Sequence, residues 1–215
     1  MLRQEYYWPG CKTVALDVET TGINRTRDRI IQFGIFGIQA NGDMLSLTAV
    51  IDAESSTGRD PKNLPGVDRI EVVQARPLRD HIAAVYAALE DAVVVMHNAP
   101  HDWSFIINEC QRLQHPCPRP KDIICTYQWA RRVRTTTQLL TLGALCQRTD
   151  IPLLIPHNAY HDARATFYLW IVLNNLPTSS APHNSMHCKS KYWPPRQLEM
   201  LPQYLRYKSR FPTVI

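Results

Sequence analysis

The chain has 215 residues, 45% of them hydrophobic and 20% charged, which suits one compact domain with an extension. No apolar run approaches the roughly 20 residues that a membrane-spanning helix needs, so we expect no membrane role. The N-terminus lacks the apolar core of a signal peptide, and the six cysteines form no Cys-x-x-Cys pair. We therefore expect reduced thiols and a cytoplasmic protein.

The first part of the chain predicts an antiparallel meander of strands. Residues 12–19, 29–39 and 44–51 have strand-like apolar patterns, and Asn41-Gly42 between the last two is the strongest short hairpin signal. Residues 53–70, rich in Ser, Gly, Asp and Pro, are predicted to be loop.

The second part of the chain predicts helices around one short strand. Apolar residues recur at helical spacing in 77–90, between Trp103 and Leu113, between Leu139 and Cys146, and in 159–174. The wholly apolar run 92–96 is typical of a strand covered on both faces. This order of elements favours an α/β sheet with helices on its faces.

Two carboxylates interrupt the first predicted strand, in the sequence ALDVETTG (15–22). Alternation points Val14, Leu16 and Val18 to the core and places Asp17 and Glu19 together on the opposite face. Burying two like charges is costly unless cations neutralise them. The stretch alone is equally compatible with a solvated polar face on an edge strand.

Further acids follow at the ends of other predicted elements. Asp102 comes after the apolar strand, in VMHNAPHD (95–102), and Asp162 opens the last helix, five residues after His157. Either acid alone is explained by helix capping. Four carboxylates from three termini, however, are the oxygen ligands that Mg²⁺ or Mn²⁺ prefers. Two such ions can promote phosphodiester cleavage, with a neutral histidine as the base.

The motifs D-V-E-T-T-G, H-N-x-x-x-D and H-x-x-x-x-D-A, in this order, resemble those of the DEDDh family of DnaQ-like 3′→5′ exonucleases. The resemblance spans about residues 12–175. It implies an α/β RNase H-like fold, with a mixed five-stranded sheet of order 3-2-1-4-5 flanked by helices. We accordingly expect an exonuclease domain at 1–176 and an extension at 177–215.

The same resemblance implies roles for individual residues. Asp17, Glu19 and Asp162 would hold a first divalent cation. Asp17 would bridge to a second one, and Asp102 would complete the site. His157 would be the general base, because the H-x-x-x-x-D spacing selects it over His97, His101 and His161.

Other motif residues would contact the substrate. Asn98 would orient the terminal nucleotide, while Thr20, Thr21 and Gly22 would bring backbone groups near the 3′ end, where Gly allows close approach. Ile23 would pack on the last base, or else belong to the core. The family usually has an aromatic residue where this chain has His101, which puts the shape of the nucleotide pocket in question.

The expected function is hydrolysis of phosphodiester bonds at the 3′ ends of single-stranded or frayed DNA, which releases nucleoside 5′-monophosphates. DNA is favoured because ETTG resembles the polymerase-associated branch of the family. Two alternatives remain open: the same reaction on RNA, as in the RNase T and oligoribonuclease branches, and a nucleic-acid-binding scaffold whose site has lapsed.

The net charge of +5 is concentrated in the extension. Residues 1–176 carry equal numbers of basic and acidic side chains, so the whole excess lies in 177–215. This favours contact with a polyanion, or else a merely solvated tail. QLEML (197–201) resembles peptides that bind the bacterial sliding clamp, although QLLTL (138–142) fits almost as well.

Overall fold

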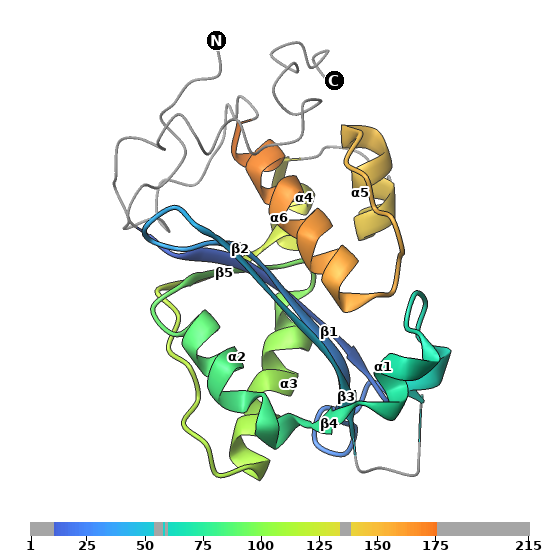
Figure 1. Cartoon of the computed structure of the whole chain (residues 1–215). Helices are drawn as coiled ribbons and strands as arrows, with labels where there is room; N and C mark the ends of the chain where they lie inside the picture. The colour runs from blue at the N-terminus through green and yellow to red at the C-terminus, as the bar shows by residue number, and fades with distance from the viewer. Residues whose placement is uncertain (1–10, 54–57, 59, 134–138, 176–215) are drawn as a thin grey trace.

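The structure is a computed structural model, and it describes residues 11–53, 58, 60–133 and 139–175 (Figure 1). Its centre is a mixed sheet whose first three strands form the expected antiparallel meander: β1 (Thr13–Thr20), β2 (Ile30–Ile38) and β3 (Met44–Asp52). At the β2–β3 turn the Gly42 amide donates to the carbonyl of Gln39 at 3.0 Å, and φ is +94° at Gly42. The Asn-Gly hairpin prediction is thereby confirmed.

Two parallel strands extend the sheet beyond β1. They are β5 (Val93–Met96), beside β1, and β6 (Asp122–Cys125), beside β5. On the far edge, the two-residue strand β4 (Arg76–Pro77) pairs with β3. The strand order β4-β3-β2-β1-β5-β6 contains the five expected strands in the expected order and adds one short edge strand.

Helices cover both faces of the sheet (Figure 1). One face carries α2 (Ile82–Leu89) and α3 (Ala99–Arg112), and the other carries α6 (Ala159–Asn175). Packed beside α6 are α4 (Thr126–Val133) and α5 (Leu142–Thr149). The predicted class, an α/β fold of RNase H-like architecture, is confirmed.

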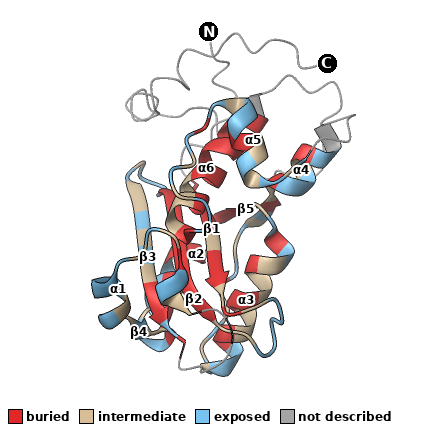
Figure 2. Cartoon of the chain, turned by 90° about the vertical axis from the view of Figure 1, so that its right-hand side faces the viewer, coloured by how far each residue is buried: buried red, intermediate tan, exposed pale blue. Residues whose placement is uncertain are grey.

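Two hydrophobic clusters lie between these layers. Figure 2 shows that buried residues are concentrated on the central strands and on parts of the helices that cover them. Val14, Leu16 and Val18 pack on the side of α2 and α3, as the alternation in β1 predicted. Ala15 and Phe36 pack on the side of α6. Because β1 lies under helices on both sides, even its short alanine is fully buried.

The prediction that residues 53–70 are loop throughout was wrong. A 3-10 turn spans Pro61–Asn63, and α1 (Arg69–Val73) begins within the predicted loop. Its start is a capping box, in which Asp68 and Glu71 each bond the other's backbone amide, at 2.7 and 2.9 Å. This local pairing stabilises a helix that has no buried residue of its own.

The cysteines only partly match the expectation of reduced thiols. Cys110, Cys117, Cys125 and Cys146 are free, whereas Cys11 is disulfide-bonded, which corrects the prediction for that residue. Of the helices described, none is long and apolar enough to cross a bilayer. The predicted extension 177–215, including 197–201, lies outside the described residues.

Candidate active site

The central strand β1 supplies Asp17 and Glu19. It runs between β2 and β5, so the alternative of a solvated edge strand is excluded. Both carboxylates project from the face that α6 covers, where Asp17 is partly exposed and Glu19 is buried. Buried carboxylates need a partner charge, a cation or a bound proton in the folded protein.

Asp102 reaches the same edge from the next parallel strand. β5 lies beside β1, with Ala15 paired to Val95, so the helix that follows β5 starts at the same end of the sheet. The N-cap residue of α3 is Asn98, and its side chain makes no capping hydrogen bond. Asp102 lies in the first turn of α3, four residues after Asn98, and is 4% exposed. Asp102 is therefore not the N-cap residue of α3, and its carboxylate accepts backbone hydrogen bonds from its own amide and from Val18 of β1.

The start of α6 lies directly on the sheet beside these carboxylates. Gly34 and Gln32 of β2 are the cross-strand partners of Asp17 and Glu19, respectively. A Cβ atom at Gly34 would collide with the carbonyl group of Ala159, and Gln32 Oε1 accepts a 2.9 Å hydrogen bond from the Ala159 amide. This close approach brings the first turn of α6 next to β1.

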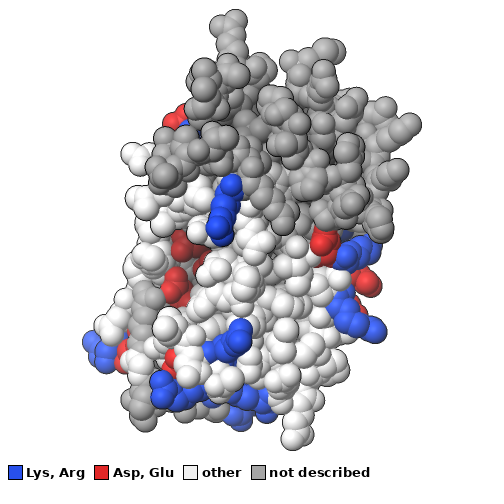
Figure 3. Space-filling model, turned by 180° about the vertical axis from the view of Figure 1, so that it is seen from behind, with Lys and Arg blue, Asp and Glu red and all other residues white. Residues whose placement is uncertain are grey.

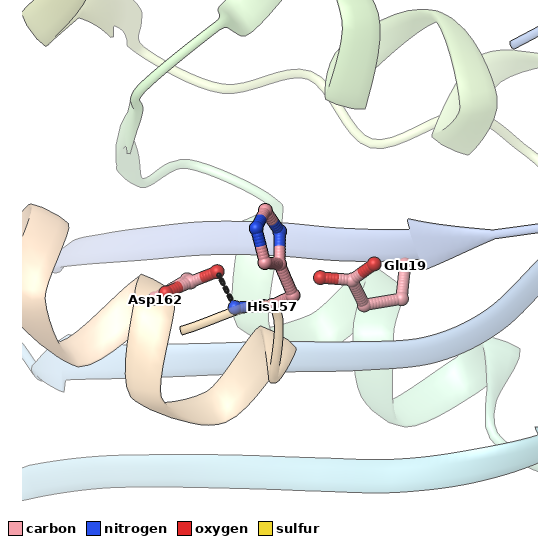
Figure 4. Close-up of side chains that lie close together, drawn as sticks. All are labelled: Glu19, His157 and Asp162. Atoms are coloured by element: carbon pink, nitrogen blue, oxygen red, sulfur yellow. Dashed lines mark hydrogen bonds between the residues drawn. The ribbon is translucent and has the colours of Figure 1, made fainter. Parts of the chain in front are cut away.

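Asp162 and His157 meet Glu19 at this helix start (Figure 4). Each of the three side chains offers a ligand atom, and these atoms lie within 4.8 Å of one another. The His157 backbone N–H donates to Asp162 Oδ2 at 3.0 Å. With φ at +61°, His157 has left-handed backbone, and its side chain is exposed at the edge of the buried carboxylates.

The carboxylates interact electrostatically as one cluster. Burial, followed by the charges of Asp102, Asp162 and Glu19, holds the pKa of Asp17 well above its usual range. Burial also raises the pKa of Asp102 to about 7 and that of Asp162 to about 6, although backbone hydrogen bonds partly oppose both shifts. Without a cation the cluster therefore holds protons near neutral pH.

The donor set fits a hard divalent cation. Asp162 Oδ1 is buried and finds no hydrogen-bond partner within the described part of the chain. The nearby Cys146 thiol stays protonated, because burial and then the charge of Asp162 raise its pKa to about 12. The remaining candidate ligands are carboxylate oxygens and one imidazole, a set that suits Mg²⁺ or Mn²⁺. Figure 3 shows acidic side chains in a surface hollow, with basic ones above and below it.

The other histidines of the motifs have different surroundings. Both ring nitrogens of His97 are engaged, Nδ1 with Thr126 Oγ1 at 2.8 Å and Nε2 with the carbonyl of Leu140 at 3.0 Å. His101 packs against Phe105, with ring centroids 5.0 Å apart. His161 lies outside the group of Glu19, His157 and Asp162.

The β1–β2 loop forms the rim of the site. Ile23 is 91% exposed, so the alternative that it belongs to the core is excluded. It lines a hollow of about 530 Å³ together with exposed Asn98, at the start of α3. Thr21 and Gly22 line a second hollow beside it. The hydroxyls of Thr20 and Thr21 form hydrogen bonds within the loop. That of Thr20 donates to the Gly22 carbonyl at 2.7 Å, and that of Thr21 accepts from the Arg29 amide at 3.0 Å.

The motifs did not identify every residue of this rim. The hollow between Ile23 and Asn98 is also lined by Asn24, Arg25, Thr26, Pro100, His101 and Ser104. They come from the β1–β2 loop and from α3, which are far apart in sequence. The family resemblance implied that Ile23 and Asn98 lie near the same nucleotide, but apart from the His101 departure it did not indicate these six residues.

Comparisons with known proteins agree with this geometry. Residues 14–170 match the family model RNase_T, described as "Exonuclease". The PolC-type DNA polymerase III of Oceanobacillus iheyensis is 26% identical over 164 residues, which cover 76% of this chain and 11% of that protein. The 3′-5′ exonuclease DinG of Staphylococcus haemolyticus is 28% identical over 156 residues, covering 73% and 17%. The chain thus spans a small part of the length of these curated relatives.

Solved structures share the fold. Exonuclease X in complex with 5′ overhanging duplex DNA aligns with a TM-score of 0.56 and 19% identity, covering 81% of this chain and 96% of that one. The nuclease domain of 3′hExo, a DEDDh family member bound to rAMP, aligns with a TM-score of 0.61 and 13% identity, covering 75% and 90%. An α/β nuclease architecture with a carboxylate cluster is thus the class that fold and site define. The chain belongs to the RNase_T exonuclease family, of the DnaQ-like DEDDh type.

Proposed function

We propose that the chain is a 3′→5′ exonuclease that releases nucleoside 5′-monophosphates from single-stranded or frayed 3′ ends of DNA. The observation that carries this proposal is the convergence of four carboxylates and His157 from β1, α3 and the start of α6. The open rim at Ile23 and Asn98 offers room for a strand end beside them.

In this proposal two divalent cations, Mg²⁺ or Mn²⁺, would be held by Asp17, Glu19, Asp102 and Asp162. Bound cations would supply Lewis-acid stabilisation of the phosphate charge and of the leaving oxygen. His157 accepts the proton of the attacking water, whose oxygen forms the new bond to phosphorus. The bond from phosphorus to the 3′ oxygen of the preceding nucleotide breaks, and this oxygen takes a proton from solvent water, which leaves a shortened strand with a 3′ hydroxyl.

We assign substrate contacts to the residues of the β1–β2 loop and of the start of α3 that form the rim of the site. Ile23 offers an exposed apolar side chain on which the terminal base can stack, and Asn98 lies across the same hollow. Thr20, Thr21 and Gly22 place backbone groups next to the carboxylates. Because Thr21 closes the loop through its hydroxyl, we assign it a contact through the backbone rather than the side chain.

RNA is the second candidate substrate, and two structural neighbours favour it. One is 3′hExo bound to rAMP, and the other is described as 3′-end specific recognition of histone mRNA stem-loop by 3′-exonuclease. DNA remains our first choice because the similar sequences include PolC and DinG. A scaffold with a lapsed site is disfavoured, since the motif carboxylates are all present.

The test is digestion of 5′-labelled DNA and RNA oligonucleotides of the same sequence, with Mg²⁺, with Mn²⁺ and with excess EDTA. We expect a ladder that shortens from the 3′ end, faster on DNA, and no products in EDTA. Asp17→Asn and Asp102→Asn should abolish cleavage while folding persists, because each removes a ligand and relieves repulsion between acids. Cleavage in EDTA would contradict the metal requirement, and binding without cleavage would favour the scaffold.

A further inference from the structure

The β1–β2 loop is held in one conformation by its own hydrogen bonds. The carbonyl of Asn24 accepts the amides of Arg27 and Asp28 at 3.0 and 2.7 Å, and Asp28 Oδ2 accepts the Asn24 amide at 2.7 Å. At the base of the loop, the Thr21 amide donates to the Arg29 carbonyl at 2.9 Å. The loop is therefore ordered locally, but these bonds do not fix its distance from α3.

Arg112, at the end of α3, makes that connection. Its Nη2 donates to the carbonyl of Thr26 at 2.7 Å and reaches that of Arg25 at 3.5 Å, while its Nη1 donates to the carbonyl of Asp28 at 3.2 Å. One guanidinium thus spans three carbonyl groups of the loop, which its planar arrangement of donors permits and a lysine could not reproduce.

Glu109, one turn earlier on α3, orients this guanidinium. Its side chain is 1% exposed, and Oε1 accepts from Arg112 Nη1 at 2.8 Å. The same carboxylate is bound twice by Arg29, from Nε at 2.8 Å and from Nη2 at 3.2 Å. A buried carboxylate with several charge-assisted bonds has little freedom to move, so it fixes where Arg112 can lie.

The network connects the rim to the carboxylate cluster through one rigid element. Asn98 and Asp102 lie at the first turns of α3, and Glu109 and Arg112 lie at its last turn. The loop held by Arg112 faces the start of the helix across the hollow that Ile23 and Thr26 line. The width of this hollow therefore depends on the hydrogen bonds at the far end of α3.

We propose that Glu109 and Arg112 are positioning residues for substrate binding: they set the loop against α3 so that the strand next to the scissile phosphate is gripped. The proposal rests on the exonuclease function above. Neither residue touches the carboxylate cluster, so removing the network should weaken binding of a strand and leave the reaction at the metal site intact.

Two substrates separate these effects. A single-stranded DNA oligonucleotide places its terminal nucleotide in the hollow, whereas bis(p-nitrophenyl) phosphate is a phosphate diester with no base or sugar to occupy the hollow. For Arg112→Met we expect KM for the oligonucleotide to rise about tenfold, with kcat and cleavage of the ester within about twofold of wild type. Arg112→Lys should be intermediate, because it can pair with Glu109 but cannot span the carbonyls.

Arg119→Met is the matched control, since Arg119 forms an exposed ion pair with Glu90 at 3.4 Å. It should leave both substrates unaffected. Equal losses on the oligonucleotide and the ester, or no change with either, would overturn the positioning role. If wild-type protein cleaves neither substrate, it is the exonuclease proposal that fails.

Limited trypsin digestion tests the anchoring without any activity. Peptides ending at Arg25 or Arg27 should appear early in Arg112→Met, and late in wild type and Arg119→Met, when followed by mass spectrometry. Glu109→Gln should resemble Arg112→Met, because it removes the charge that orients the guanidinium. If release of these peptides is as slow in Arg112→Met as in wild type, the loop does not depend on Arg112 and the inference is wrong.

Discussion

At the scale of single residues, the histidines show how far a motif can decide a role. H-x-x-x-x-D selected His157, and the structure brings a ring nitrogen of this residue within 4.8 Å of carboxylate oxygens of Glu19 and Asp162. His97 is bound at both ring nitrogens and so lacks a free lone pair for proton transfer. The motif could not indicate the left-handed backbone at His157, which a non-glycine residue adopts at some cost.

We therefore expect His157→Ala to slow hydrolysis at neutral pH by about 10²–10⁴-fold, the usual scale for removal of a general base. His161→Ala should have a much smaller effect, because that ring lies outside the cluster. Single-turnover rates on a labelled oligonucleotide, with melting temperatures to confirm folding, would measure the difference. Similar rates for the two variants, or the reverse order, would show that our choice of base is wrong.

The carboxylates predict an unusual dependence of stability on pH. Because burial raises the pKa of Asp102 to about 7 and of Asp162 to about 6, the folded protein holds protons that the unfolded chain releases from about pH 4 upward. The free energy of unfolding should therefore fall as pH rises through this window in the absence of metal. Added Mn²⁺ should reverse the loss, because it replaces the bound protons.

Thermal melting in EDTA at about pH 5 and about pH 7.5 would measure this effect. The matched variant, Asp102→Asn with Asp162→Asn, lacks both titrating groups and should melt at more similar temperatures under the two conditions. If wild type and the double variant show the same change with pH, Asp102 and Asp162 do not contribute to it.

At the scale of elements, the site depends on how closely α6 approaches β2. Gly34 leaves no room for a Cβ atom against the carbonyl of Ala159, so Gly34→Ala should push the first turn of α6 away from the sheet. Asp162 and His157 would move with it. Since small misplacements of catalytic groups are costly, we expect activity to drop by about 10²-fold, together with a loss of thermal stability.

Gly143→Ala in α5 is the control for this substitution. The new Cβ would lie 3.9 Å from its nearest neighbour, a side-chain atom of Leu153, which is an ordinary contact. Activity and melting temperature should therefore be at least as high as in wild type. An active Gly34→Ala protein would show that the approach of α6 to the sheet is not what places Asp162.

The elements that the sequence predicted are those with a strong local signal. Alternation and Asn41-Gly42 were sufficient for β1, β2 and β3, and helical spacing was sufficient for α6. β4 has only two residues, one of them Pro77, so no periodicity could indicate it. The missed α1 did carry a signal, because Asp68 and Glu71 have the spacing of a capping box.

In the site, too, the features with a local sequence signal were predicted and those that depend on the folded chain were not. Its carboxylates stand in short local motifs, whereas the hollow beside them is made where the β1–β2 loop meets α3. Arg112 binds carbonyl groups that lie 84, 86 and 87 residues away from it in the chain. Such an interaction arises only from the folded sheet, which is why the sequence predicted the chemistry of the site better than its substrate-binding side.

At the scale of the whole molecule, charge separates the described domain from the rest of the chain. Residues 1–176 are balanced and 177–215 carry the excess of +5, with five aromatic residues interleaved: Tyr192, Trp193, Tyr204, Tyr207 and Phe211. Basic side chains bind phosphates with release of counterions, and aromatic rings stack on unpaired bases. We expect the extension to strengthen binding to nucleic acid without taking part in the chemistry.

A partner peptide is a separate expectation for the same extension. QLEML (197–201) resembles sliding-clamp-binding peptides, and a pulldown with a bacterial sliding clamp would test it. Wild type should be captured, and Gln197→Ala with Leu198→Ala should not. Absence of wild-type binding would end this idea, without bearing on the role of the basic residues.

Truncation after residue 176 distinguishes an extension that binds the substrate from one that packs on the domain. If the extension holds the substrate, the truncated protein should cleave short oligonucleotides normally at saturation but bind longer strands more weakly. The slope of log K against log salt should then shrink by about 0.7 for each phosphate that the truncated protein no longer neutralises. If the aromatic residues pack on the domain instead, truncation should lower the melting temperature, because apolar surface becomes exposed, and leave the slope unchanged. Unchanged affinity together with an unchanged slope would reject the hypothesis that the extension binds the substrate. The charge of the extension would then act only on solubility.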